Sequence, residues 1–135
     1  MILVDTSVII DYLKGAENGK TLMFDRIISR DIPFGISAYT YQELLQGARD
    51  GREYEALKEY LSSQKIYILP SDLVYYEQAA KLFFDLRRKG RTIRSAIDVL
   101  IAQTAIYFGL SLLHNDRDFD IIAEEIESFR VLNEL

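Results

Sequence analysis

The stretch "LSLLHNDRDFD", residues 110–120, changes from apolar to acidic side chains within a few positions. Leu110–Leu113 is apolar apart from one serine, which is typical of a short strand buried on both faces. Asp116, Asp118 and Asp120 follow at alternate positions. A buried strand that ends in this much negative charge indicates either a polar turn or a site that binds cations.

The start of the chain has a similar pattern, because the apolar Ile2–Val4 is followed directly by Asp5. From Ser7 the apolar residues recur at helical spacing, so a helix is predicted from there to about Gly15. Further short strands are predicted at residues 34–36, 66–69 and 129–132. Short apolar strands that alternate with helices indicate an α/β fold with a mainly parallel sheet of about five strands.

The remaining helices are expected at residues 20–30, after Ser37, around residues 54–61 and from Ser71 to Arg88. Ser37 and Ser71 are the predicted N-caps, because their hydroxyls can accept from the first free backbone N–H groups. The segment "SAIDVLIAQTAIYFG", residues 95–109, is almost entirely apolar. It therefore predicts a helix that is covered on most sides and ends at its final glycine.

The composition sets the class of protein. A length of 135 residues fits a single domain spanning residues 1–135. The chain has no cysteine, which excludes disulfides and thiolate metal ligands. The first apolar run is interrupted by Asp5 and lacks a basic leader, and no stretch reaches the roughly 18 to 20 apolar residues of a membrane span. We therefore expect a soluble, cytoplasmic protein that does not bind membranes.

The net charge gives an ambiguous signal about nucleic acids. Sixteen basic and 21 acidic side chains give a net charge of -5, which on its own argues against a nucleic-acid partner. If several carboxylates surround cations, however, most of this negative charge is accounted for. The global charge therefore does not decide whether the protein binds RNA.

Four carboxylates are expected to meet at one end of the sheet. In open parallel sheets, ligands bind at the carboxyl ends of the strands, near the point where the strand order reverses. Asp5 and Asp116 follow strands, Glu43 lies about two turns into a helix, and Asp98 lies in the first turn of the apolar helix. Clustered carboxylates raise one another's pKa unless a cation joins them, and Mg²⁺ and Mn²⁺ prefer oxygen ligands. Such a site suits hydrolysis of phosphodiester bonds.

Each acid also has an ordinary structural interpretation. Asp5 could cap the first helix, and Asp98 could form a capping box with Ser95. Glu43 could be a solvated helix residue beside the apolar stripe. Each interpretation is plausible alone, and it is the combination of the four acids that favours a metal site.

Four segments together resemble PIN-domain ribonucleases, in particular the VapC toxins of bacterial and archaeal toxin–antitoxin pairs. These segments are "ILVDTSVIIDYLKG", "ISAYTYQELLQGA", "IRSAIDVLIAQTAIYFG" and "LSLLHNDRDFDII". They occur in the order and spacing of the family and cover essentially the whole chain. The resemblance implies a PIN-like three-layer α/β/α fold.

The resemblance also implies that the metal ligands and catalytic residues are Asp5, Glu43, Asp98 and Asp116. Asp118 is a less certain further ligand. A hydroxyl after the first aspartate usually supports the site, and Ser7 is preferred over Thr6 for this role. His114 departs from the Thr or Ser of many relatives: it could contact a ligand carboxylate, the metal or RNA, or it could be a half-buried histidine satisfied by the backbone.

The segment "RRKGRTIR", residues 87–94, is the only dense basic stretch, and it directly precedes the helix that carries Asp98. Arg91 and Arg94 lie beyond the expected helix end, so we predict that they bind RNA phosphates. The alternative is a solvated helix terminus, where cations are favoured by the helix dipole.

The predicted function is that of a Mg²⁺- or Mn²⁺-dependent endoribonuclease that acts as a toxin. The resemblance implies an RNA substrate, a cognate antitoxin that wraps a hydrophobic groove, and a homodimer. The alternatives are a PIN nuclease in RNA processing and an inactive PIN-like scaffold, although retention of all four acids argues against the scaffold. Ser7 stands where a haloacid-dehalogenase-like phosphatase would need a second Asp, and Leu69 and Pro70 stand where a response receiver would need one.

Overall fold

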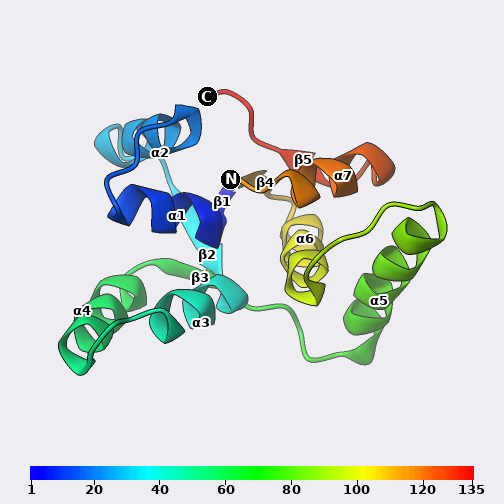
Figure 1. Ribbon diagram of the computed structural model, residues 1–135, viewed down its shortest axis with the longest axis horizontal. Coiled ribbons are helices and arrows are strands. Elements are labelled where there is room, and N and C mark those ends of the chain that lie inside the picture. Colours follow the sequence, from blue (N-terminus) through cyan, green and yellow to red (C-terminus); the bar gives the residue numbers. More distant parts are fainter.

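The computed structural model describes residues 1–135 and contains one all-parallel, five-stranded sheet. The strand order is β3-β2-β1-β4-β5 (Figure 1). The strands are β1 (Ile2–Val4), β2 (Phe34–Ser37), β3 (Lys65–Tyr67), β4 (Ser111–Leu113) and β5 (Arg130–Val131). The predicted parallel α/β architecture is confirmed, and β3 begins and ends slightly earlier than expected.

Seven helices enclose the sheet. They are α1 (Thr6–Leu13), α2 (Gly19–Ser29), α3 (Ala38–Gln46), α4 (Gly51–Ser62), α5 (Leu73–Arg88), α6 (Ala96–Phe108) and α7 (Arg117–Glu125). Helices α1 to α4 lie on one side of the sheet and α5 to α7 on the other (Figure 1). The predicted three-layer arrangement is therefore confirmed. None of these helices combines the length and apolar character needed to cross a membrane.

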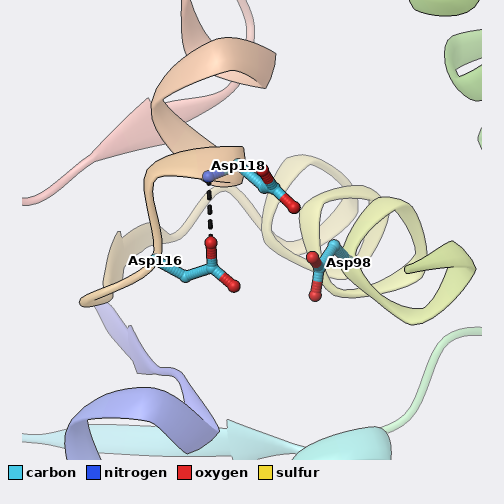
Figure 2. A group of neighbouring side chains, drawn as sticks. All are labelled: Asp98, Asp116 and Asp118. Carbon is cyan, nitrogen blue, oxygen red and sulfur yellow. Dashed lines mark hydrogen bonds between the residues drawn. The ribbon is translucent and has the colours of Figure 1, made fainter. Parts of the chain in front are cut away.

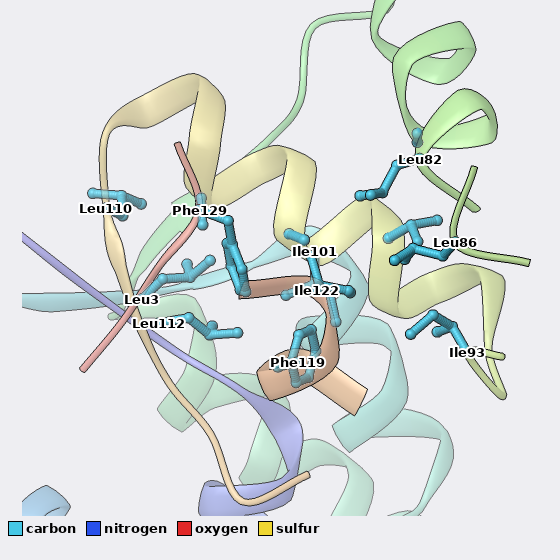
Figure 3. Close-up of a cluster of buried hydrophobic side chains, with 14 of the residues drawn as sticks. Leu3, Leu82, Leu86, Ile93, Ile101, Leu110, Leu112, Phe119, Ile122 and Phe129 are labelled. Atoms are coloured by element: carbon cyan, nitrogen blue, oxygen red, sulfur yellow. The ribbon is translucent and has the colours of Figure 1, made fainter. Parts of the chain in front are cut away.

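Two hydrophobic cores form because successive residues of a strand point to opposite faces of the sheet. Leu3 packs into the core beneath α5, α6 and α7, whereas its neighbours Ile2 and Val4 pack beneath α1 to α4. Leu112 and Leu113 divide in the same way between the two cores. Figure 3 shows the first of these cores. Burial on both faces explains why these strands are apolar throughout.

The strand order places the reversal point between β1 and β4. The chain builds outward from β1 through β2 to β3 on one side, and β4 and β5 extend the sheet on the other. Val4 is paired with Leu113, and the backbone N–H of Asp5 donates to Leu113 O at 2.9 Å. The carboxyl ends of β1 and β4 therefore lie side by side, which is where ligands bind in such sheets.

Two local predictions are wrong and one is confirmed. No helix was predicted between β4 and β5, but the segment after β4 begins the helix α7, with Asp116 as its N-cap. Asp72, and not Ser71, caps α5 by accepting from Val74 N. Gly109 ends α6 as predicted, with a left-handed φ of 66° that a residue with a side chain adopts at a cost.

Candidate active site

Three aspartates form the tightest acidic group of the molecule. Carboxylate oxygens of Asp98, Asp116 and Asp118 all lie within 4.8 Å of one another (Figure 2). Asp98 comes from the first turn of α6, and the other two come from the start of α7. Because α7 begins shortly after β4, its first residues lie at the point between β1 and β4 where the strand order reverses.

The start of α7 explains how Asp116 serves the helix and the site together. Asp116 Oδ1 accepts from Asp118 N at 3.0 Å, the usual hydrogen bond of an N-cap. Its second oxygen points toward Asp98 (Figure 2). Capping therefore orients the Asp116 carboxylate and leaves one oxygen for a ligand.

Asp5 is the N-cap of α1, as the ordinary interpretation proposed. Asp5 Oδ2 accepts from Ser7 N at 3.0 Å and from Ser7 Oγ at 2.7 Å. Its side chain is buried, and this burial, together with the negative charge of Glu43, raises the pKa of Asp5. Ser7 Oγ also accepts from Asn115 N at 2.9 Å, so it joins α1 to the loop that precedes Asp116.

Glu43 is oriented by a row of hydroxyl groups. Thr6 Oγ1 lies 2.8 Å from Glu43 Oε1 and 3.1 Å from Thr40 Oγ1, and Thr40 Oγ1 lies 3.3 Å from Ser37 Oγ. Because a carboxylate only accepts, the Thr6 hydroxyl donates to Glu43, and the Thr40 hydroxyl is left to donate to Thr6. Sequence reasoning preferred Ser7 over Thr6 and overlooked Thr40. The spacing of Thr40 three residues before Glu43 on one helix face was the available signal.

Asp98 is partly buried and lies close to the four other carboxylates of the site. Burial, followed by the charges of Asp116, Asp5, Asp118 and Glu43, raises the pKa of Asp98 to about 7. All four neighbouring carboxylates therefore act on this one side chain. Asp5 and Glu43 are close enough for this effect but lie outside the 4.8 Å group.

The proposed capping box of α6 does not form. Ser95 Oγ accepts from Ile97 N at 3.2 Å, whereas the Asp98 carboxylate makes no hydrogen bond within the protein. The Asp98 side chain is thus directed to the acidic group and not to the helix end (Figure 2).

Arg91 and Arg94 both contact carboxylates. Arg94 Nη2 lies 2.9 Å from Asp116 Oδ1, and Arg94 Nε lies 3.1 Å from Asp118 Oδ2. Arg91 Nη2 instead lies 2.7 Å from Glu124 Oε2, near the end of α7. Of the two arginines predicted to bind RNA, only Arg94 is part of the acidic group.

His114 is almost fully buried beside Asp116. Its Nδ1 accepts from Asp116 N at 3.1 Å, so the proton of the neutral imidazole is on Nε2. Nε2 lies 3.2 Å from Asp120 Oδ1, without the alignment of a hydrogen bond. Burial lowers the pKa of His114, which favours the neutral form. The backbone therefore satisfies only one of the two ring nitrogens, so the interpretation of a half-buried histidine satisfied by the backbone holds only in part, and the Nδ1 contact helps to fix the position of Asp116.

The chemistry of the donors fits a hard divalent cation. The donors of the acidic group are carboxylate oxygens, which Mg²⁺-like ions prefer, and the chain has no thiolate. Burial and, after it, the negative charge of the neighbouring carboxylates raise the pKa of Asp98, and a bound cation would offset both effects.

Comparisons with known proteins agree with this geometry. Residues 2–125 match the family model of the PIN domain. Ribonuclease VapC11 of Mycobacterium tuberculosis is 32% identical over 128 residues, covering 91% of this chain and 92% of that protein. The structure of FitAcB from Neisseria gonorrhoeae has a TM-score of 0.69 and 25% identity, covering 98% of this chain and 97% of that one. VapBC-5 of M. tuberculosis, from the VapBC family of toxin–antitoxin systems, has a TM-score of 0.65 and 22% identity, covering 98% and 97%.

Proposed function

The chain belongs to the PIN domain family and to its VapC ribonuclease branch, and from that premise we propose that it is a divalent-metal-dependent endoribonuclease and the toxin of a toxin–antitoxin pair. The observation that carries the proposal is the group of three aspartates within 4.8 Å at the reversal point of the sheet. Such a site suits metal-dependent hydrolysis of a phosphodiester bond.

We assign two different roles to the acidic residues of the site. Asp98, Asp116 and Asp118 would hold the ion, Mg²⁺ or Mn²⁺. When bound, the ion supplies charge stabilisation of the scissile phosphate and activation of the attacking water. Asp5 and Glu43 add negative charge, and their orientation is fixed by Ser7 and Thr6.

The test of this function is RNA cleavage by the purified protein with Mg²⁺ or Mn²⁺. We expect Asp98→Asn and Asp5→Asn to lower kcat/KM by at least about a hundredfold, the upper end of what losing a supporting partner of a metal ligand costs. Asp85→Asn is the matched control, because Asp85 lies on the exposed surface of α5 and pairs with Lys81. Circular dichroism checks that each variant is folded. The proposal fails if wild type cuts no RNA with either ion, or if both site variants cut as well as wild type.

We propose that Arg94 and Arg91 also contact RNA phosphates. The Arg94 side chain is 72% exposed beside the acidic group, so part of its guanidinium remains open to solvent. Arg91 lies further away and is 35% exposed. Neutralising each to Gln is expected to weaken RNA binding and to reduce its salt dependence. Cleavage that is unchanged at every salt concentration would reject this role. An RNA substrate would place the activity in the cytoplasm.

We propose that the antitoxin binds a groove between α1, α3 and α4. This groove has a volume of about 620 Å³, and Glu43 lies on its wall. Ile10, Leu13 and Leu57 supply apolar lining, and Leu13 is 56% exposed. An amphipathic segment seated here would cover apolar surface and reach the acidic site.

The probe for this groove is the product of a short reading frame beside the gene, co-expressed with the chain. Leu13→Glu is expected to weaken the complex, whereas Phe84→Glu, on the other side of the sheet, leaves it intact. Equal effects of the two variants would reject the groove.

We propose that two copies of the chain associate through an exposed apolar patch. Tyr75 of α5 packs edge-on against Tyr107 at the end of α6, and the exposed apolar residues of these segments and of the loop before α5 are Ile68, Leu73, Val74, Tyr107 and Phe108. Exposed apolar patches of this kind mark interaction surfaces. Sedimentation velocity is expected to show a dimer that Tyr107→Glu dissociates, and a monomeric wild type at micromolar concentration would reject the patch.

A further inference from the structure

Arg94 directs three N–H donors at two of the three clustered aspartates. Its backbone N and its Nε each donate to Asp118 Oδ2 at 3.1 Å, and its Nη2 donates to Asp116 Oδ1 at 2.9 Å. No other basic side chain of the chain contacts either carboxylate. Arg94 therefore links the two ligands that come from α7.

The hydrogen bonds use only one oxygen of each carboxylate. Asp116 Oδ1 accepts from both Arg94 and Asp118 N, and Asp118 Oδ2 accepts from both Arg94 donors. Asp116 Oδ2 and Asp118 Oδ1 accept no hydrogen bond. In Figure 2 the unbonded oxygen of Asp116 is the one directed toward Asp98. Each carboxylate thus has a held oxygen and a free oxygen.

We propose that Arg94 is a positioning residue of the metal centre: by holding one oxygen of Asp116 and one of Asp118, it presents the other oxygen of each to the ion. This inference rests on the proposed metal site and adds a residue to it. Partners that orient metal ligands in this way raise metal affinity in other proteins.

The loop that carries Arg94 is anchored well enough for this role. Ile93 is buried in the core that contains α6 and α7, as Figure 3 shows. At the start of the loop, Arg91 N donates to Leu86 O at 2.8 Å. The backbone of Arg94 is therefore fixed relative to Asp118, and its side chain needs only to reach Asp116.

The shape of the guanidinium matters as well as its charge. A planar guanidinium offers donors in a fixed fork, so one side chain can hold two carboxylates in a set geometry, whereas a Lys ammonium is a point charge on a flexible stem. A positive charge beside the ion also repels it, so charge alone would make Arg94 unfavourable for metal binding. Positioning and charge therefore have opposite effects on metal affinity.

The charge-preserving variant Arg94→Lys separates these two effects. We would titrate the full chain with Mn²⁺ by calorimetry and compare Arg94→Lys with Arg91→Lys, the same change in the same loop but outside the acidic group. Arg94→Lys is expected to raise the Kd for Mn²⁺ about tenfold, the lower end for loss of a supporting partner. Arg91→Lys is expected to leave it unchanged. Thermal unfolding checks that both variants are folded.

A double-mutant cycle tests whether Arg94 acts through Asp116. In an Asp116→Ala background, Arg94→Lys should cost less Mn²⁺ affinity than it does in wild type, because the ligand that it positions is gone. An equal cost in both backgrounds would overturn the inference, since it would indicate a general structural effect.

Two further results would also overturn it. One is an unchanged Kd in Arg94→Lys together with tighter binding in Arg94→Gln, which would make Arg94 a competitor of the ion. The other is a wild type that does not bind Mn²⁺, which would refute the proposed metal site itself and so differs from failure of the positioning role alone.

Discussion

The two halves of the candidate site hold their carboxylates by different means. The C-terminal half contains Asp98, Asp116 and Asp118, two of which accept charged hydrogen bonds from Arg94. The N-terminal half contains Asp5 and Glu43, which accept from the hydroxyls of Ser7 and Thr6.

This difference explains the spacing of the acids. A guanidinium offsets part of the repulsion between neighbouring carboxylates, so the C-terminal half can bring three of them within 4.8 Å. Neutral hydroxyls orient a carboxylate but offset little of its charge, and Asp5 and Glu43 stay outside that group. We therefore expect the ion to bind at the C-terminal half. The N-terminal half is expected to contribute further negative charge beside it.

The largest expected effect comes from removing the anchor of the C-terminal half. Phe119 directly follows Asp118 on α7 and is fully buried in the core that Figure 3 shows. The centroid of its ring lies 5.1 Å from that of His114. Phe119→Ala is expected to lower the free energy of unfolding by about 3–5 kcal/mol, measured by urea denaturation.

The matched control for this prediction is Phe24→Ala, which removes an equally buried ring from the other core. Both variants should lose stability, but at temperatures where both are folded only Phe119→Ala should bind Mn²⁺ more weakly. Equal Mn²⁺ affinities in the two variants would show that α7 does not set the ligand geometry.

A smaller effect is expected in the N-terminal half. Thr6→Val removes the hydroxyl that orients Glu43 at nearly constant volume, and kcat/KM for RNA cleavage should fall roughly tenfold. Thr104→Val deletes a buried hydroxyl that donates to Leu100 O on α6 and serves as the control. Activities of the two variants within about twofold of each other would argue against a role for Thr6.

A third expected effect concerns the pH dependence of the free energy of unfolding. Its size is limited because Asp98 is only partly buried. The usual pKa of an Asp is 3.8, and in the fold the pKa of Asp98 is about 7, so between these values the folded chain binds more protons than the unfolded chain. The contribution of Asp98 to stability is therefore fully present below pH 3.8 and is lost as the pH rises through about 7.

Asp98→Asn isolates this contribution from other titrating groups. In EDTA, Asp98→Asn should gain stability relative to wild type between pH 5 and pH 7.5, measured by urea denaturation. The same difference in stability at both pH values would contradict the raised pKa of Asp98.

The sequence predicts the parts of the fold that rest on local patterns. The apolar strand Ile2–Val4 followed by an acid, the cap at Ser37 and the stop at Gly109 all follow from rules about a few adjacent residues, and all three are confirmed. The helix α7 was missed because "RDFDIIAEE" has four acids among nine residues and resembles a polar turn. Its anchors Phe119 and Ile122 become meaningful only once the core is known.

The site was less predictable than the fold. The order of the acids along the chain indicated where they would gather, but not that Asp118 would join the closest group while Asp5 and Glu43 stay outside it. The sequence also did not predict the contacts of Arg94 with Asp116 and Asp118, because these aspartates lie 22 and 24 residues after Arg94 in the chain. Side-chain partners across such distances are fixed by tertiary packing and not by local pattern.

The central claim is that Asp98 and the two aspartates of α7 bind a divalent cation. The most direct measurement is calorimetric titration of Mn²⁺ into the wild-type chain and into Asp98→Asn at pH 7.5. We expect saturable binding to wild type, and binding weaker by at least about a hundredfold in Asp98→Asn. No binding to wild type, or equal binding to both chains, would contradict the claim.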